Sequence, residues 1–135
     1  TIRFALLPLV APTNAARIAR LADSGALNGL TFHRVVPGFV IQGGSPGANE
    51  FAGHGAFSRD EISDQAHWRG TVGLSTRGRD TGDGQIFINL LDNLRLDNEY
   101  TIYGRVVAGM DGVDAALEGA RIDDAMVITA ASDSN

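Results

Sequence analysis

The sequence predicts a mainly β fold, an antiparallel barrel or sandwich with helices at its ends. Three observations predict it. At least six short runs have strand character, only two segments have helical spacing, and those two segments lie far apart in the chain. The strands are joined mainly by loops, which disfavours a doubly wound parallel sheet. A chain of 135 residues fits one domain with a substantial core.

The first part of the chain predicts a strand, a helix and a strand pair. Residues 2–7 form the first strand, and a helix starts within residues 11–14 and ends at Gly25, with apolar residues at helical spacing. The segment FHRVVPGFVIQGG, residues 32–44, contains two strands joined by a Pro-Gly turn signal. Residues 43–60 are rich in glycine and predict a long surface loop.

The second part alternates short strands with loops. We expect strands at 71–75, 85–88, 101–107 and 125–130, a glycine- and aspartate-rich loop at 77–84, a helical turn or loop at 92–97, and a short helix at 111–117 that Gly119 closes. No repeat and no internal domain boundary is visible. The start at Thr1 instead of a methionine is consistent with a mature or excised domain of a longer protein.

Composition excludes several classes of chemistry. The net charge of −5 argues against nucleic acid or an anionic membrane as the main partner, and no apolar run approaches the length of a membrane span. The chain has no cysteine, which excludes thiol catalysis, disulfides and cysteine-ligated metals. It has no lysine, which excludes Schiff-base chemistry on a side chain. Cytoplasmic and periplasmic locations both remain allowed.

Hydrolytic, metal and phosphate sites find little support. The only histidines are His33, His54 and His67, and the chain has no G-x-S-x-G pattern. As metal ligands, His54, Glu61 and His67 are too far apart for one helical face, and HExxH is absent. Residues 80–84 resemble a calcium loop only faintly, because they lack its third acidic ligand and its terminal glutamate. The glycine pairs fit no phosphate-binding motif. We therefore expect no metal and no cofactor.

One constellation remains after these exclusions. Arg34 lies in an apolar strand, where an unpaired charge is costly to bury unless it has a use. Phe39 and Gln42 follow after the turn, and Gln85 and Phe87 share one face of a later strand. Any one of these could be structural, with the arginine reaching solvent and the phenylalanines filling the core. Taken together, they predict a site.

Three segments resemble the cyclophilins, the cyclophilin-type peptidyl-prolyl cis/trans isomerases. Residues 32–44 are similar to the family's signature, residues 70–75 and 81–88 to its second motif, and residues 96–97 and 102–111 to its third. The resemblance covers nearly the whole chain in order, and it is greatest to compact bacterial members. It implies a closed eight-stranded antiparallel β-barrel capped by two α-helices. The two further strands are expected near residue 30 and within residues 55–60.

The resemblance also implies a role for each site residue. Arg34 matches the catalytic arginine. Gln42 and Gln85 match groups that hold the substrate backbone, and the peptide is expected to lie along Ser75 and Thr76. The proline pocket and its wall are implied for Phe39, Val40, Phe87, Leu96 and Tyr100.

Two positions depart from the family pattern. Arg95 stands where many members have a tryptophan associated with cyclosporin binding, so that binding is expected to be weakened. Tyr100 stands where many have a histidine, but it keeps an aromatic edge and a polar tip.

The resulting hypothesis is an isomerase of Xaa-Pro bonds that assists protein folding. We expect it to act as a monomer on proline-containing peptide or protein segments, without a covalent intermediate. A second hypothesis is a binding module in which the same groove captures such segments and turnover is incidental. A third is a structural barrel domain for protein–protein contacts.

Overall fold

The computed structural model describes residues 1–49, 53–55, 57–76 and 79–128. Its elements, in chain order, are β1 (Arg3–Leu6), α1 (Pro12–Asp23), β2 (Thr31–Phe32), β3 (Arg34–Val36), β4 (Val40–Gly43), β5 (Thr71–Leu74), β6 (Ile86–Asn89), the 3₁₀-helix η1 (Leu94–Leu96), β7 (Ile102–Ala108), α2 (Met110–Ala115) and β8 (Ala120–Arg121).

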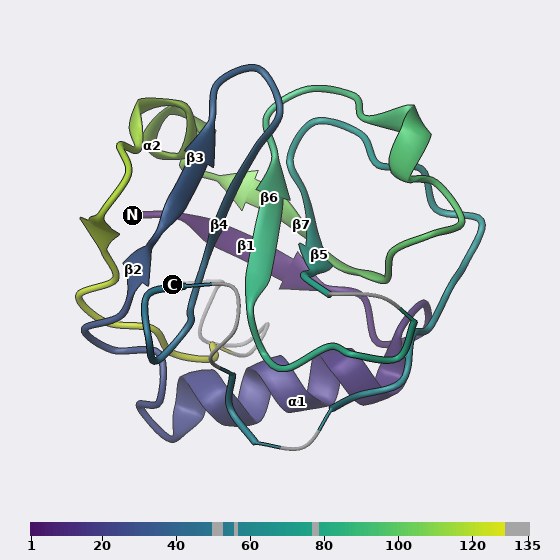
Figure 1. The fold of residues 1–135 in the computed structure, drawn as a ribbon, viewed down its shortest axis with the longest axis horizontal. Helices are drawn as coiled ribbons and strands as arrows, with labels where there is room; N and C mark the ends of the chain where they lie inside the picture. Colours follow the sequence, from purple (N-terminus) through teal and green to yellow (C-terminus); the bar gives the residue numbers. More distant parts are fainter. Residues whose placement is uncertain (50–52, 56, 77–78, 129–135) are drawn as a thin grey trace.

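Six of the strands form one antiparallel sheet in the order β1-β7-β5-β6-β4-β3, and β2 pairs with β8 in a separate two-stranded ladder. The Pro-Gly turn aligns β3 with β4 so that Arg34 pairs with Gln42 and Val36 with Val40. At the turn, Gly38 has a φ of 69°, a conformation that glycine adopts without steric cost. Figure 1 shows α1 and α2 at opposite ends of the sheet, with α2 close to the N-terminus.

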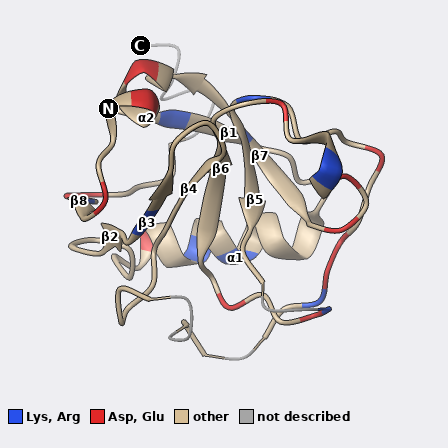
Figure 2. Cartoon of the chain, turned by 45° about the horizontal axis from the view of Figure 1, so that its top comes forward, with Lys and Arg blue, Asp and Glu red and all other residues tan. Residues whose placement is uncertain are grey.

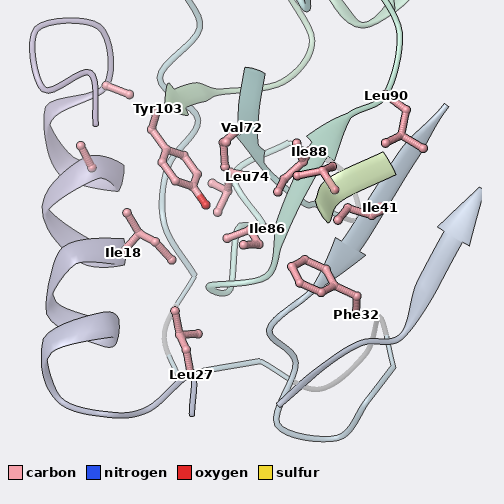
Figure 3. Packing of buried hydrophobic residues seen from close by; sticks show 13 residues of the cluster. Ile18, Leu27, Phe32, Ile41, Val72, Leu74, Ile86, Ile88, Leu90 and Tyr103 are labelled. Atoms are coloured by element: carbon pink, nitrogen blue, oxygen red, sulfur yellow. The ribbon is translucent and has the colours of Figure 1, made fainter. Parts of the chain in front are cut away.

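The core lies between α1 and the sheet. Ile18 projects from α1 toward Tyr103, Leu74 and Ile86, which are all buried (Figure 3). The carboxylate of Glu61 accepts hydrogen bonds from the backbone N–H groups of Thr13 and Asn14, at 3.1 and 2.7 Å. These are donors that the first turn of a helix leaves without intrahelical partners, so Glu61 caps α1.

The mainly β class, both helices and most strand positions are confirmed. The expected strand near residue 30 is β2, and the one within 55–60 is reduced to a bridge between Ser58 and Gly82. Closure of the strands into one barrel is not confirmed, because no ladder joins β1 to β3 within the described residues.

The expected last strand is wrong over residues 125–128, and residues 129–130 lie outside the described part. The chain instead pairs earlier, at β8 and through Ile122, which exchanges backbone hydrogen bonds with Gly29 and Leu30. Beyond Ile122, the N–H of Ala125 bonds to the side chain of Asn28. The described chain offers Met126 and Val127 no ladder partner, and both are exposed.

The described residues also include no helix long and apolar enough to span a bilayer.

Candidate active site

One pocket of about 690 Å³ opens beside β3, β4 and β6. Six of its twelve lining residues are apolar or aromatic, and the other six contribute amides, hydroxyls, one imidazole and one guanidinium. The lining residues are His33, Arg34, Phe39, Val40, Gln42, Ala48, Asn49, Ser75, Thr76, Phe87, Leu96 and Tyr100. An apolar hollow with a few convergent polar groups is the usual form of a small binding site.

A chain of hydrogen bonds positions the guanidinium of Arg34. Nη1 of Arg34 donates to Oε1 of Gln42 over 3.3 Å, and Nε2 of Gln42 donates to Oε1 of Gln85 over 3.2 Å. Gln85 is in turn held by the carboxylate of Asp83, which accepts from its backbone N–H and its Nε2. Gln42, Gln85 and Asp83 are all buried, whereas Arg34 is exposed at the rim. The buried amides therefore support a cation that itself remains solvated.

Phe87 forms the aromatic floor, and three neighbours fix it. It pairs with Gly73 across the β5–β6 ladder, and a Cβ added to Gly73 would lie 2.5 Å from the Phe87 ring. The imidazole of His67 stacks on the same ring at 5.8 Å with an interplanar angle of 14°, and Tyr100 meets it edge-on at 5.8 Å. The ring is thus clamped between a glycine backbone and two aromatic side chains.

Phe39, another lining residue, is held through its backbone. Its carbonyl accepts hydrogen bonds from the N–H of Leu90 at 2.8 Å and from Nδ2 of Asn93 at 3.0 Å. Asn93 also donates to Oδ1 of Asn89, whose Nδ2 bonds to Thr71 and lies 3.3 Å from Nδ1 of His67. One buried polar network therefore connects the supports of both phenylalanines.

Burial lowers the pKa of His67, while the carbonyl of Tyr100 and the carboxylate of Asp97 oppose that shift. The side chain is fully buried, and its backbone N–H donates to Oδ1 of Asp97 at 2.8 Å. A neutral imidazole is the form that suits a stack against an apolar ring.

Comparison with known proteins identifies the family. The model of the cyclophilin type peptidyl-prolyl cis-trans isomerase/CLD family matches residues 1–131. The chain belongs to this family. Peptidyl-prolyl cis-trans isomerase B of Bacillus subtilis is 38% identical over 112 residues, which is 82% of this chain and 78% of that protein. A peptidyl-prolyl cis-trans isomerase of Synechococcus elongatus is 39% identical over 105 residues, 78% of this chain and 72% of that one.

The fold agrees with solved cyclophilins. The crystal structure of a Cryptosporidium parvum cyclophilin type peptidyl-prolyl cis-trans isomerase, determined in the presence of the dipeptide Ala-Pro, matches with a TM-score of 0.80 at 25% identity. That match covers 90% of this chain and 85% of the other. The activity of this cyclophilin is that of its family, isomerisation of peptidyl-prolyl bonds, with assistance to protein folding as its general role.

The structure brings together nearly all of the site residues that the sequence predicts. Nine of the ten line the pocket, and the tenth, Gln85, lies behind Gln42 as its hydrogen-bond partner. One expectation about Arg34 is wrong. Its side chain is exposed, so it carries no cost of burial. The strand that carries it, β3, lies at the edge of the sheet, where alternate side chains reach solvent.

Sequence reasoning missed two parts of the site. His33, Ala48 and Asn49 also line the pocket, and His67 supports it from below. His33 precedes Arg34 in the signature segment, which could have drawn attention to it. His67 carries no local signal, because its role depends on Asn89 and Phe87 in a strand far along the chain.

The residues weighed as metal ligands have other partners. Nε2 of His54 bonds to the carbonyl of Gly44 at 2.6 Å, and the carboxylate of Glu61 caps α1. Across the described ranges, no group of three or more His, Cys, Asp or Glu side chains is placed to hold a metal ion.

Proposed function

We propose that Arg34 is the catalytic residue of this cyclophilin and that the pocket beside it holds the proline ring of the substrate. The observation that carries the proposal is the hydrogen-bond chain Arg34–Gln42–Gln85, which places one solvated guanidinium at the rim of an apolar pocket. The solved relative determined with Ala-Pro supports a proline-containing peptide as the ligand.

The barrier to Xaa-Pro rotation is lost amide resonance, about 18–20 kcal/mol without a catalyst. When the bond is twisted, the prolyl nitrogen becomes pyramidal and gains a lone pair. A fixed donor aimed at that lone pair stabilises the twisted state more than either planar state, and such selective stabilisation raises the rate. Each ~1.4 kcal/mol of it accelerates rotation about tenfold.

Arg34 has the properties that this step needs. Its guanidinium is always charged and carries five N–H donors in a planar fork. One donor is committed to Gln42, which fixes the direction of the group and leaves others for the substrate. No proton is transferred and no covalent bond forms, so the step requires no nucleophile and no acid–base pair.

The other residues hold the peptide while the bond rotates. We assign the proline ring to the hollow bounded by Phe39, Val40, Phe87 and Leu96, with Tyr100 at its wall. Ser75 and Thr76, directly after β5, border the same hollow and offer backbone and hydroxyl groups to an extended peptide. We assign to Gln42 a contact with the substrate backbone, and Gln85 supports Gln42 through their hydrogen bond.

An exchange assay separates this proposal from its alternatives. NMR exchange spectroscopy on a short Ala-Pro peptide reports the cis–trans rate directly, and chemical-shift titration of the protein reports binding. We expect the peptide's cis–trans exchange to become faster and the chemical shifts of Phe87 and Tyr100 to change as the peptide binds. Binding without faster exchange would support a capture module, and neither effect would support a purely structural domain.

Three finer expectations remain proposals. We propose that residues 1–135 act as one monomeric domain, that their strands close into a barrel in the family manner, and that cyclosporin binds weakly. Sedimentation at several protein concentrations tests the first, because a monomer shows no concentration dependence.

A further inference from the structure

Arg95 lies against the wall of the proline pocket. Its guanidinium carbon is 4.6 Å from the centroid of the Phe39 ring, within the range of a cation–π contact. Phe39 lines the pocket, and so does Leu96, the residue that follows Arg95. Arg95 itself is not a lining residue, but it lies directly against one lining residue and next in sequence to another.

The backbone fixes the place of Arg95. It is the central residue of η1, whose N-terminal neighbour Asn93 bonds through its N–H to the carbonyl of His67 at 2.7 Å. The side chain of the same Asn93 holds the carbonyl of Phe39 at 3.0 Å. One buried asparagine thus ties the helix that carries the cation to the residue on which the cation lies.

The charge of Arg95 is not neutralised within the described part of the chain. No described carboxylate lies within ion-pair distance of its guanidinium, although the protein has an excess of acidic residues. The nearest acids in sequence face elsewhere: Asp92 accepts from the N–H of Arg69, and Asp97 from the N–H of His67. Figure 2 shows the acidic segments distributed over the loops and α2.

The pocket itself adds to this local positive charge. Arg34 lies on its rim, and none of the described lining residues is acidic. One guanidinium therefore lines the hollow and a second lies against the ring of a lining residue, Phe39, in a chain whose net charge is −5. A guanidinium that lies over a ring keeps N–H donors at its edge, and those donors suit a carboxylate.

We propose that Arg95 is a specificity-determining residue that makes this cyclophilin prefer Xaa-Pro segments with an acidic side chain next to the proline. The preference rests on the proposed function, because it assumes that the proline ring occupies the hollow beside Phe39. The acidic residue lies on the side of the proline that faces η1, away from the segment that runs along Ser75 and Thr76.

Two matched pairs of blocked hexapeptides test this. In one pair Glu or Gln precedes the proline, and in the other Glu or Gln follows it, with alanine elsewhere. For each peptide, NMR exchange gives kcat/KM and an NMR titration gives Kd, at low and at high salt. The proteins are the wild type, Arg95→Gln, Arg95→Glu and the control Arg20→Gln, whose charge lies on α1 away from the pocket.

We expect one of the two Glu peptides to exceed its Gln partner about three- to fivefold in kcat/KM and in affinity at low salt, as for an exposed ion pair. The ratio should fall toward one at about 1 M salt, where screening is strong. Arg95→Gln should bring the Glu-to-Gln ratio to one, and Arg95→Glu should make the Gln peptide the better substrate. Arg20→Gln should keep the ratio of the wild type.

Equal values for Glu and Gln in both pairs would overturn the proposal, and so would a preference that survives Arg95→Gln. Failure of the proposed function is a different result, because the wild type would then accelerate none of the four peptides. The Kd values would still show in that case whether Arg95 selects an acidic residue.

Discussion

Arg34 and Gln42 stand opposite each other in the β3–β4 ladder, and Nη1 of Arg34 donates a hydrogen bond to Oε1 of Gln42 over 3.3 Å. The register of one hairpin therefore sets the direction of the proposed catalytic group. A slip of one residue would turn Gln42 to the other face of the sheet and leave Arg34 without its support.

Removal of the guanidinium should abolish most of the catalysis without unfolding the protein. For Arg34→Ala we expect kcat/KM on an Ala-Pro peptide to fall about 100- to 1000-fold, the usual effect of losing one charge-stabilising donor. The protein should stay folded, with a modestly lower thermal midpoint, because the Arg34 side chain is exposed but the buried Oε1 of Gln42 loses its donor. NMR exchange and thermal denaturation measure the two effects, with Arg20→Ala as the matched control. Turnover close to that of the wild type in Arg34→Ala would exclude the assigned role.

Loss of Gln42 should affect both stability and rate. Gln42→Leu removes the bond to Arg34 and leaves the buried Oε1 of Gln85 without that donor, which costs about 1–3 kcal/mol of unfolding free energy. The freed guanidinium should also lose its fixed direction, so kcat should fall more than KM rises. Urea unfolding measures the free energy of unfolding, and NMR exchange at several peptide concentrations measures kcat and KM. Gln65→Leu, at an exposed glutamine, is the control.

A double-mutant cycle tests whether Gln42 acts through Arg34. If it does, Gln42→Leu should slow the Arg34→Ala protein much less than it slows the wild type, because coupled residues are not additive. Equal fractional losses in both backgrounds would show that Gln42 contributes independently.

Cyclosporin should bind this protein weakly. Arg95 offers a solvated cation where many relatives offer an indole, and an indole presents far more apolar surface to a lipophilic ligand. We expect micromolar or weaker affinity by titration calorimetry, and tighter binding to Arg95→Trp. Nanomolar affinity of the wild type would contradict this account.

The sequence predicts the parts of this site that depend on local pattern. Alternation in residues 34–42 and the Pro-Gly turn predict an arginine and a carboxamide on two neighbouring strands. The structure adds the register that pairs Arg34 with Gln42. The roles of Phe39, Phe87 and Leu96 come from the family resemblance, and the structure places all three around one hollow.

Contacts between distant segments are what the sequence does not reveal. The support of Phe39 by Asn93, and of Phe87 by His67, joins residues 54 and 20 positions apart. The last predicted strand fails for a related reason. Residues 125–128 have strand composition, but a strand also needs a partner, and within the described chain Ile122 has already paired with Leu30.

The stability of the protein should fall as the pH decreases below the ordinary pKa of histidine. Burial lowers the pKa of His67 in the folded state, so the unfolded chain binds a proton there more readily. Stability rises with pH wherever the unfolded state binds more protons, and the effect therefore begins near pH 6.5 and grows downward. Urea unfolding at intervals from pH 7.5 to pH 5 should show this slope.

His67→Asn isolates the contribution of this histidine. Asparagine cannot be protonated in this range, so the variant should be less stable at pH 7.5, where it loses the stack on Phe87, but should have a shallower pH slope. If the unfolding free energies of the wild type and His67→Asn fell in parallel between pH 6.5 and pH 5, His67 would not be the group that carries the dependence.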